Sequence, residues 1–214
     1  MKGLLYCSMV VLAGVMLMAC KDGDNNSPQK RDIVQESAGQ ASSPEICLYR
    51  YDDFPVQKAN MLADVLRKVY PAVTLQAAAL ALPKEHYNKE RNRYRGTGLL
   101  EDLRRHRNGN VLLGLTDEVI FMSNELSLTY GIFGLSFTGS GLAIISSTRP
   151  SGKAQSEDHL VKLMMHEMGH AFGLKHCSDQ HCFMVDAEHG DKFSQTPAFC
   201  KSCKSFLNGK GWKL

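Results

Sequence analysis

Residues 166–177 of the 214-residue chain read HEMGHAFGLKHC and gather side chains that can bind a metal ion. His166 and His170 are four positions apart, so on a helix their imidazoles lie one turn above each other and can bind one cation. Gly173 can leave the helix in a left-handed turn, which lets His176 return as a third nitrogen ligand. Three neutral imidazoles leave one corner of a zinc tetrahedron open, and we expect water to fill it.

Glu167 follows the first of these histidines and completes a catalytic set. Zinc lowers the pKa of a bound water to about 7, and the Glu167 carboxylate is directed at the same space, where it can take that proton as general base. The resulting hydroxide can attack a carbonyl group that the metal polarises. The alternative is a helix whose histidines are only structural, and the spacing of all five residues argues against it.

The pattern HExxHxxGxxHC, followed by C-x4-C-x-M and a trailing C-x-x-C, closely resembles the archaemetzincins, which are metzincin-clan zinc metallopeptidases. Residues 166–203 carry this resemblance. It implies an α+β fold, with a metzincin-like single domain, a twisted mixed β-sheet, an active-site helix and a zinc-clamped C-terminal subdomain. It also implies a hydrolase that acts on a peptide or protein substrate, and it allows an aminopeptidase-like preference for short peptides.

The resemblance gives each residue of the pattern a role. His166, His170 and His176 would bind the catalytic zinc, and Glu167 would be the general base. Met184 would form the turn beneath this zinc that metzincins share. A second, structural zinc would be held by four cysteines: Cys177, Cys182, Cys200 and Cys203.

The same four cysteines allow a competing interpretation. Four thiolates at about 2.3 Å close a tetrahedron around zinc, so such an ion stabilises the fold without catalysing. An oxidising compartment would instead permit disulfides such as Cys177 to Cys182. The two closely spaced pairs favour zinc, which predicts two zinc ions per chain. Cys47 falls in a predicted strand and is expected to be a buried thiol.

The first twenty residues, MKGLLYCSMVVLAGVMLMAC, resemble a bacterial lipoprotein signal peptide. A lysine precedes an apolar run that is short for a membrane span and ends on small residues. Residues 1–19 would be the signal peptide, and Cys20 would carry acyl chains that anchor the protein to a membrane. An ordinary cleaved signal or an uncleaved anchor is the alternative. We expect the protein in the bacterial cell envelope, on the periplasmic face or the cell surface.

The segment after this cysteine is polar and contains few large apolar side chains. Such a composition cannot bury enough surface to fold, so residues 20–44 are predicted to be the lipidated cysteine and a flexible linker. Residues 45–214 would form the metzincin-like zinc peptidase domain.

The charge of the chain is nearly balanced, with 25 basic and 22 acidic residues and a formal net charge of +3. This balance gives no reason to expect a nucleic-acid partner. Two small basic clusters, RNRYR at 91–95 and RRHR at 104–107, are expected to be solvated faces of helices or loops.

Alternating strands and helices are predicted ahead of the metal-binding stretch, which favours a mixed sheet covered by helices. The expected strands are 46–51, 73–82, 111–116, 130–137 and 142–147, and the expected helices are 56–70 and 98–107. A further helix over 157–173 has its apolar residues on one arc and His166, Glu167 and His170 on the other. Ser156 is expected to cap it.

Two other functions are compatible with these residues. One is a zinc-stabilised surface binding module whose catalytic apparatus is vestigial, and the intact histidines and Glu167 argue against it. The other is a zinc hydrolase that acts on a non-peptide amide. Tyr130, Phe133 and Phe137 can line a substrate cleft, but aromatic residues in strands are more often part of the core.

Overall fold

The computed structural model describes residues 43–52, 54–123, 129–186 and 193–214. The chain divides into two units, Met1–Gln40 and Ala41–Leu214. The predicted signal peptide, Cys20 and the linker up to residue 42 lie outside the described residues. Within the described ranges, no helix has the length and apolar character needed to cross a membrane.

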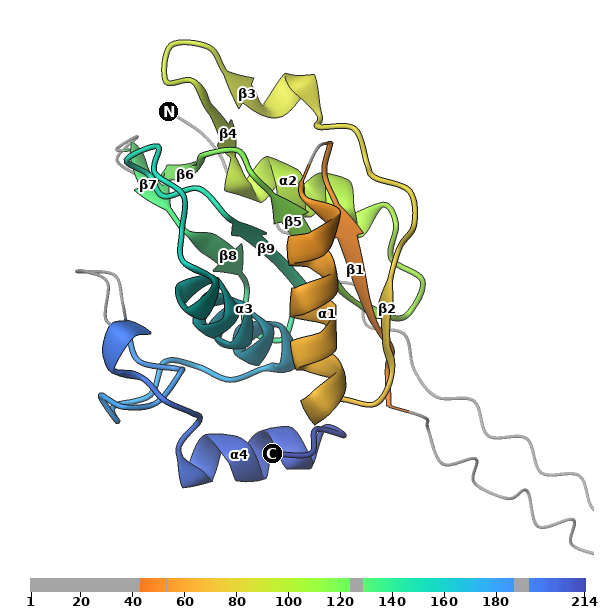
Figure 1. The fold of residues 1–214 in the computed structure, drawn as a ribbon, viewed down its shortest axis with the longest axis vertical. Coiled ribbons are helices and arrows are strands. Elements are labelled where there is room, and N and C mark those ends of the chain that lie inside the picture. Colours follow the sequence, from red (N-terminus) through yellow and green to blue (C-terminus); the bar gives the residue numbers. More distant parts are fainter. Residues whose placement is uncertain (1–42, 53, 124–128, 187–192) are drawn as a thin grey trace, which may run out of the picture. The chain divides into compact units, whose positions relative to one another are not determined.

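A five-stranded sheet forms the centre of the described unit (Figure 1). Its strands β2, β1, β5 and β9 run parallel, and β8 is antiparallel to β9 at one edge. The central strand β5 is buried along its whole length, because it has neighbours on both sides and helices on both faces. In sheet order the strands are β2 (Val73–Leu75), β1 (Ile46–Arg50), β5 (Val111–Thr116), β9 (Leu142–Ser146) and β8 (Gly134–Ser136).

Four other strands form a second sheet, which the sequence patterns did not separate from the first. In sheet order they are β3 (Tyr87–Asn88), β4 (Arg93–Arg95), β6 (Ile120–Ser123) and β7 (Thr129–Ile132). The expectation that RNRYR is a solvated helix or loop face is wrong for its second half. Arg93 and Tyr94 are half-buried in β4, and the Tyr94 ring packs 5.0 Å from that of Tyr87, centroid to centroid.

Four α-helices cover the five-stranded sheet and its ends (Figure 1). They are α1 (Val56–Val69), α2 (Gly96–Arg104), α3 (Glu157–Phe172) and α4 (Lys201–Asn208). Two short 3-10 helices span Lys84–His86 and Phe193–Gln195. The mixed α/β fold, the early helices and the helix that carries the metal-binding stretch are confirmed.

The two faces of the sheet belong to two separate hydrophobic cores. On β5, Val111 and Leu113 pack with α1 and α3, whereas Leu112 packs with α2 on the opposite face. This alternation follows from the two-residue period of a strand. The larger core also includes Cys182, Met184 and Trp212, so the C-terminal segment packs onto the same face as α3.

The strand expected over 73–82 is much shorter than predicted. It ends at Leu75, and beyond it the chain pairs again with Tyr51 through an isolated bridge at Leu80. The intervening alanines 77–79 are exposed. Their small side chains offer little cross-strand packing, which is what stabilises a strand on a sheet.

Candidate metal centres

Local signals at both ends fix the helix that carries the metal-binding stretch. The Ser156 hydroxyl accepts a hydrogen bond from the backbone N–H of His159 at 3.2 Å, and acidic residues occupy the first turn. These features stabilise the amino end of a helix. At the other end Gly173 adopts φ +112°, a left-handed conformation that favours glycine. The chain therefore leaves α3 at Gly173, shortly before His176, as the sequence predicts.

His166 and His170 point their Nε2 atoms at each other. The Nδ1 of His166 donates to the carbonyl oxygen of Phe183 at 2.7 Å, and the Nδ1 of His170 donates to that of Leu174 at 2.8 Å. Because a carbonyl only accepts, Nδ1 carries the proton in both rings and each Nε2 keeps a lone pair. The two Nε2 atoms lie 3.1 Å apart. Tetrahedral zinc with nitrogen at about 2.05 Å separates its ligand atoms by about 3.3 Å, so this pair fits the ion.

His176 joins the pair from the loop beyond α3. Its ring centroid lies 5.4 Å from that of His166 and 4.8 Å from that of His170. The nitrogen atoms of the three rings lie within 4.8 Å of one another, so the structure brings together all three predicted histidines. The Nδ1 atom of His176 lies 3.8 Å from the Asp186 carboxylate. His176 is exposed while the other two are buried, which gives the site one open side.

Burial keeps the histidine pair neutral. It lowers the pKa of His166 to about 3, and the nearby His170 adds to the effect. Burial also lowers the pKa of His170. A neutral imidazole is the form that binds a metal, so both rings are ready to act as ligands at neutral pH.

The side chain of Glu167 lies between its own helix, α3, and the edge strand β8. This side chain packs so closely against Gly134 that a Cβ atom there would lie 2.8 Å from both Cγ and Oε1 of the glutamate. Burial raises the pKa of Glu167 to about 8. A positive charge in the neighbouring histidine site would favour the carboxylate and lower this pKa.

Met184 lies under the histidine helix, as the metzincin resemblance implies. It is fully buried, and its sulfur would lie 2.4 Å from a Cβ atom on Gly169, which stands directly before His170. Only glycine at 169 leaves this space for the thioether.

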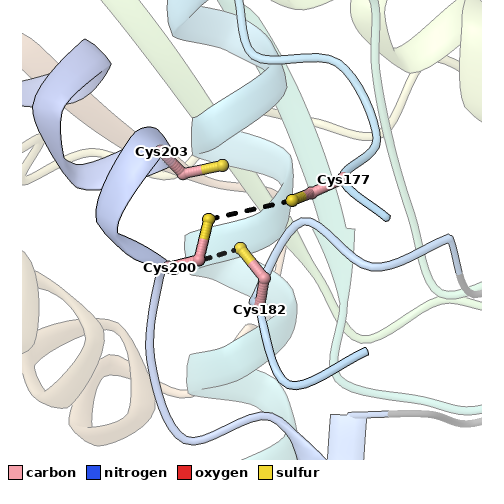
Figure 2. Close-up of side chains that lie close together, drawn as sticks. All are labelled: Cys177, Cys182, Cys200 and Cys203. Carbon is pink, nitrogen blue, oxygen red and sulfur yellow. Dashed lines mark hydrogen bonds between the residues drawn. The ribbon is translucent and has the colours of Figure 1, made fainter. Parts of the chain in front are cut away.

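The four cysteines of the sequence pattern converge in one cluster (Figure 2). Their sulfur atoms lie within 4.8 Å of one another, and those of Cys177 and Cys200 are 3.7 Å apart. All four are free thiols. A disulfide needs about 2.05 Å between sulfurs, whereas tetrahedral zinc with sulfur at about 2.3 Å separates them by about 3.8 Å. The spacing therefore fits a zinc ion.

Backbone amides donate to one sulfur of this cysteine cluster, while burial raises the pKa of Cys182 and Cys203. The N–H groups of Met184 and Cys200 donate to the sulfur of Cys182 at 3.4 and 3.3 Å. The pKa of Cys200 lies at about 6, because hydrogen bonds from Ser202 and Cys203 outweigh the burial that would raise it. Thiolates are the form that binds zinc.

One turn of the chain, residues 182–185, connects the two clusters. Cys182 belongs to the cysteine cluster, while the next residue, Phe183, supplies the carbonyl that orients His166. The carbonyl of Met184 accepts a hydrogen bond from the N–H of Cys177 at 2.7 Å, and Cys177 directly follows His176. Sequence reasoning missed the role of Phe183, because a backbone carbonyl leaves no signal in the residue type.

Other candidate residues lie outside both clusters. His159 is buried and does not lie on the surface. Its ring centroid is 5.3 Å from that of Phe133 and 5.4 Å from that of Phe193. Cys47 is a buried thiol, as expected. Tyr130 and Phe137 are 48% and 50% exposed, so the expectation that they belong to the core is wrong.

Comparison with known proteins finds one family for most of the chain. The family model for peptidase family M54 matches residues 60–209, so the likeness extends well upstream of the metal-binding stretch. The archaemetzincin of Archaeoglobus fulgidus is 31% identical over 150 residues, which cover 68% of this chain and 88% of that protein. The archaemetzincin of Methanopyrus kandleri is 32% identical over 131 residues, with 59% and 72% covered.

Solved structures show the same likeness. The crystal structure of the Methanopyrus kandleri archaemetzincin superposes with a TM-score of 0.64 at 25% identity, covering 81% of this chain and 98% of that one. The Archaeoglobus fulgidus archaemetzincin, solved in complex with malonate, gives a TM-score of 0.61 at 27% identity, covering 75% and 99%.

Proposed function

The chain belongs to peptidase family M54 and is a zinc metallopeptidase of the archaemetzincin type, and from this premise we propose how its residues divide the work of hydrolysis. His166, His170 and His176 hold the catalytic zinc, and Glu167 is the general base. The observation that carries the proposal is the pair of Nε2 atoms, 3.1 Å apart and turned toward each other by two backbone carbonyls.

Zinc bound there supplies a Lewis acid that polarises a carbonyl and acidifies a coordinated water. Glu167 takes one proton from the attacking water as the carbon–oxygen bond forms. It returns that proton to the amide nitrogen as the carbon–nitrogen bond breaks, so that an acid and an amine leave the site. Burial raises the pKa of this carboxylate and the positive charge of zinc would lower it again, toward the range in which a carboxylate both accepts and releases a proton.

We place the peptide substrate along β8, which is the edge strand of the larger sheet. An extended peptide can add to such an edge through backbone hydrogen bonds. Gly134 of β8 touches Glu167, so a peptide on this edge brings an amide bond next to the general base. Tyr130 and Phe137, both about half exposed, flank this edge in the sequence and favour substrates with apolar side chains.

We assign the second zinc to Cys177, Cys182, Cys200 and Cys203. The 3.7 Å sulfur separation and the two N–H donors to Cys182 support a tetrathiolate site. This ion closes the C-terminal segment onto the turn that orients His166, so its role is structural. We further propose that Cys20 is lipidated and anchors the enzyme in the cell envelope, as the sequence of the first twenty residues supports.

Digestion of a peptide library by wild type and by Glu167→Gln tests the catalytic assignment. Both proteins are loaded with zinc, and their zinc content is measured. We expect the variant to keep its zinc and to lose at least about 100-fold in kcat, because removal of a general base costs 10²–10⁴-fold. The positions of the cleaved bonds distinguish aminopeptidase action from cleavage within the peptide. No cleavage by fully loaded wild type would favour the vestigial binding module.

A further inference from the structure

The C-terminal segment carries an uncompensated positive charge. Residues 197–214 contain four lysines and no aspartate or glutamate. Some basic residues elsewhere are paired, for example Arg67 with Asp64 and Lys162 with Asp158. The four lysines form no ion pair with any residue in the described ranges; three of them are exposed and Lys204 is half-buried. We call them the C-terminal lysines: Lys201, Lys204, Lys210 and Lys213.

A shallow depression of about 460 Å³ lies on the outer side of α4. It is lined by Phe199, Lys201, Lys204, Ser205 and Asn208. Cys203 and Leu207 are buried on the inner side of the same helix. Two ammonium groups, a hydroxyl and an amide are donors that suit a phosphate group. No residue that we assign to either zinc lines this depression, so it is separate from both metal centres.

The N-terminal end of the described chain lies beside these lysines. A side chain on Gly211 would lie 2.5 Å from the Ser43 hydroxyl, and the Tyr70 hydroxyl donates to the carbonyl of Pro44. Residues 21–42 join this point to Cys20. In Figure 1 the C-terminus and α4 lie at one end of the domain, while β3 and β4 lie at the other. The described chain therefore begins at the lysine-bearing end of the domain.

We propose that the C-terminal lysines dock the domain on an anionic lipid surface, with the phosphodiester of a headgroup in the depression on α4. Each lysine next to such a surface strengthens binding about fivefold. Phe206 is 40% exposed and lies under the ammonium group of Lys210, which is 5.7 Å from the ring centroid. An aromatic ring paired with a cation suits the boundary between headgroups and acyl chains. The surface acts together with the proposed lipid at Cys20 and orients the enzyme on the membrane.

Vesicle sedimentation of the zinc-loaded full chain tests this proposal. Vesicles of phosphatidylcholine are compared with vesicles that also contain phosphatidylglycerol, at about 0.1 M and about 1 M salt, where the Debye length falls from ~10 Å to ~3 Å. We expect a preference for the anionic vesicles that is lost at high salt. In Lys201→Gln/Lys204→Gln the binding to anionic vesicles should fall roughly 25-fold.

The matched control is Lys84→Gln/Lys89→Gln, which removes two exposed lysines at the β3 end of the domain. Residues 1–42 are the same in every variant, so their own binding cancels. The control should bind within about twofold of wild type; an equal loss in both pairs would overturn the proposal in favour of a net-charge effect. If Lys201→Gln/Lys204→Gln loses zinc, Lys210→Gln/Lys213→Gln decides in its place. Equally tight binding of wild type to single-stranded DNA would show a general polyanion surface and also overturn lipid docking.

Discussion

At the scale of single residues, the position of Glu167 depends on a glycine that carries no functional group. Because Gly134 of β8 has no side chain, the Glu167 side chain fits between this strand and α3, with no space left for a Cβ atom at position 134. The spacing of the histidines predicts Glu167 from the sequence, because it follows from helix geometry alone. The glycine contact joins residues 33 positions apart, so no local pattern could have revealed it.

Gly134→Ala should therefore reduce activity without removing zinc. Its Cβ atom would lie 2.8 Å from Cγ and Oε1 of Glu167, and the side chain must move to admit it. A displacement of about 1 Å in a catalytic group can cost about 100-fold in rate, so we expect kcat to fall 10- to 100-fold. Gly96→Ala is the control, since its Cβ atom meets methyl groups of Ile132 and Leu135 at 3.2 and 3.3 Å and the Phe121 carbonyl oxygen at an ordinary contact distance of 3.5 Å. Similar kcat values for the two variants would contradict the tight placement of Glu167.

The stability of the metal-free protein should depend on pH through Glu167. Burial raises its pKa from 4.5 to about 8, so between these values the folded state binds more protons than the unfolded state. This contribution to stability is complete below about pH 4.5 and is lost as pH rises through 8. Glu167→Gln cannot ionise, so its free energy of unfolding relative to wild type should grow by on the order of 4 kcal/mol from about pH 5 to about pH 9.

Urea denaturation of both chelator-treated proteins measures this difference. The lowered pKa of His166 acts in the opposite direction, because its contribution is present above pH 6.5 and is lost as pH falls toward 3. It is common to both proteins and cancels in the comparison. A difference that stays constant with pH would mean that Glu167 has the same pKa in the folded and unfolded states, which would contradict the raised pKa.

At the scale of elements, the turn at residues 182–185 joins the histidine cluster to the cysteine cluster. It gives a ligand to the cysteine cluster, a carbonyl to His166 and a thioether beneath α3. The sequence does not predict α4 as a helix. It predicts α1, α2, α3 and the buried strands β1, β5 and β9 well, because their hydrophobic periods are strong. It does not predict β3 and β4, which are two and three residues long and too short to show a period.

Removal of one cysteine ligand should consequently weaken the histidine site. We expect wild type to bind two zinc ions and Cys203→Ser to bind one. The remaining ion should bind about 10- to 100-fold more weakly than in wild type, because loss of an orienting partner such as the Phe183 carbonyl has this effect. Cys47→Ser is the control: it changes a buried thiol outside the cluster, and it should keep two ions. Two bound ions in Cys203→Ser, measured by mass spectrometry under native conditions, would speak against the tetrathiolate site.

At the scale of the whole molecule, the catalytic domain and the proposed membrane anchor are separate parts of the sequence. The family match begins at residue 60, and the described chain begins at residue 43. The lipoprotein-like segment precedes both. The prediction of this anchor rests on residue types and not on contacts in the structure. It is therefore tested by locating the protein in cells.

Cys20→Ser should move the protein from the membrane fraction to the soluble fraction of cells that process lipoproteins. Without the thiol no acyl chain can be attached. Each buried methylene group of an acyl chain contributes about 0.8 kcal/mol to the free energy of membrane binding, so two or three chains make this binding lasting. Cys7→Ser is the control, because the predicted cleavage before Cys20 removes residue 7 from the mature protein. The wild type should resist a wash with about 1 M salt, which weakens the lysine-mediated attraction but not the acyl anchor. Mass spectrometry of the mature N-terminus checks the modification directly, and an unmodified Cys20 in a membrane-bound protein would contradict lipid anchoring.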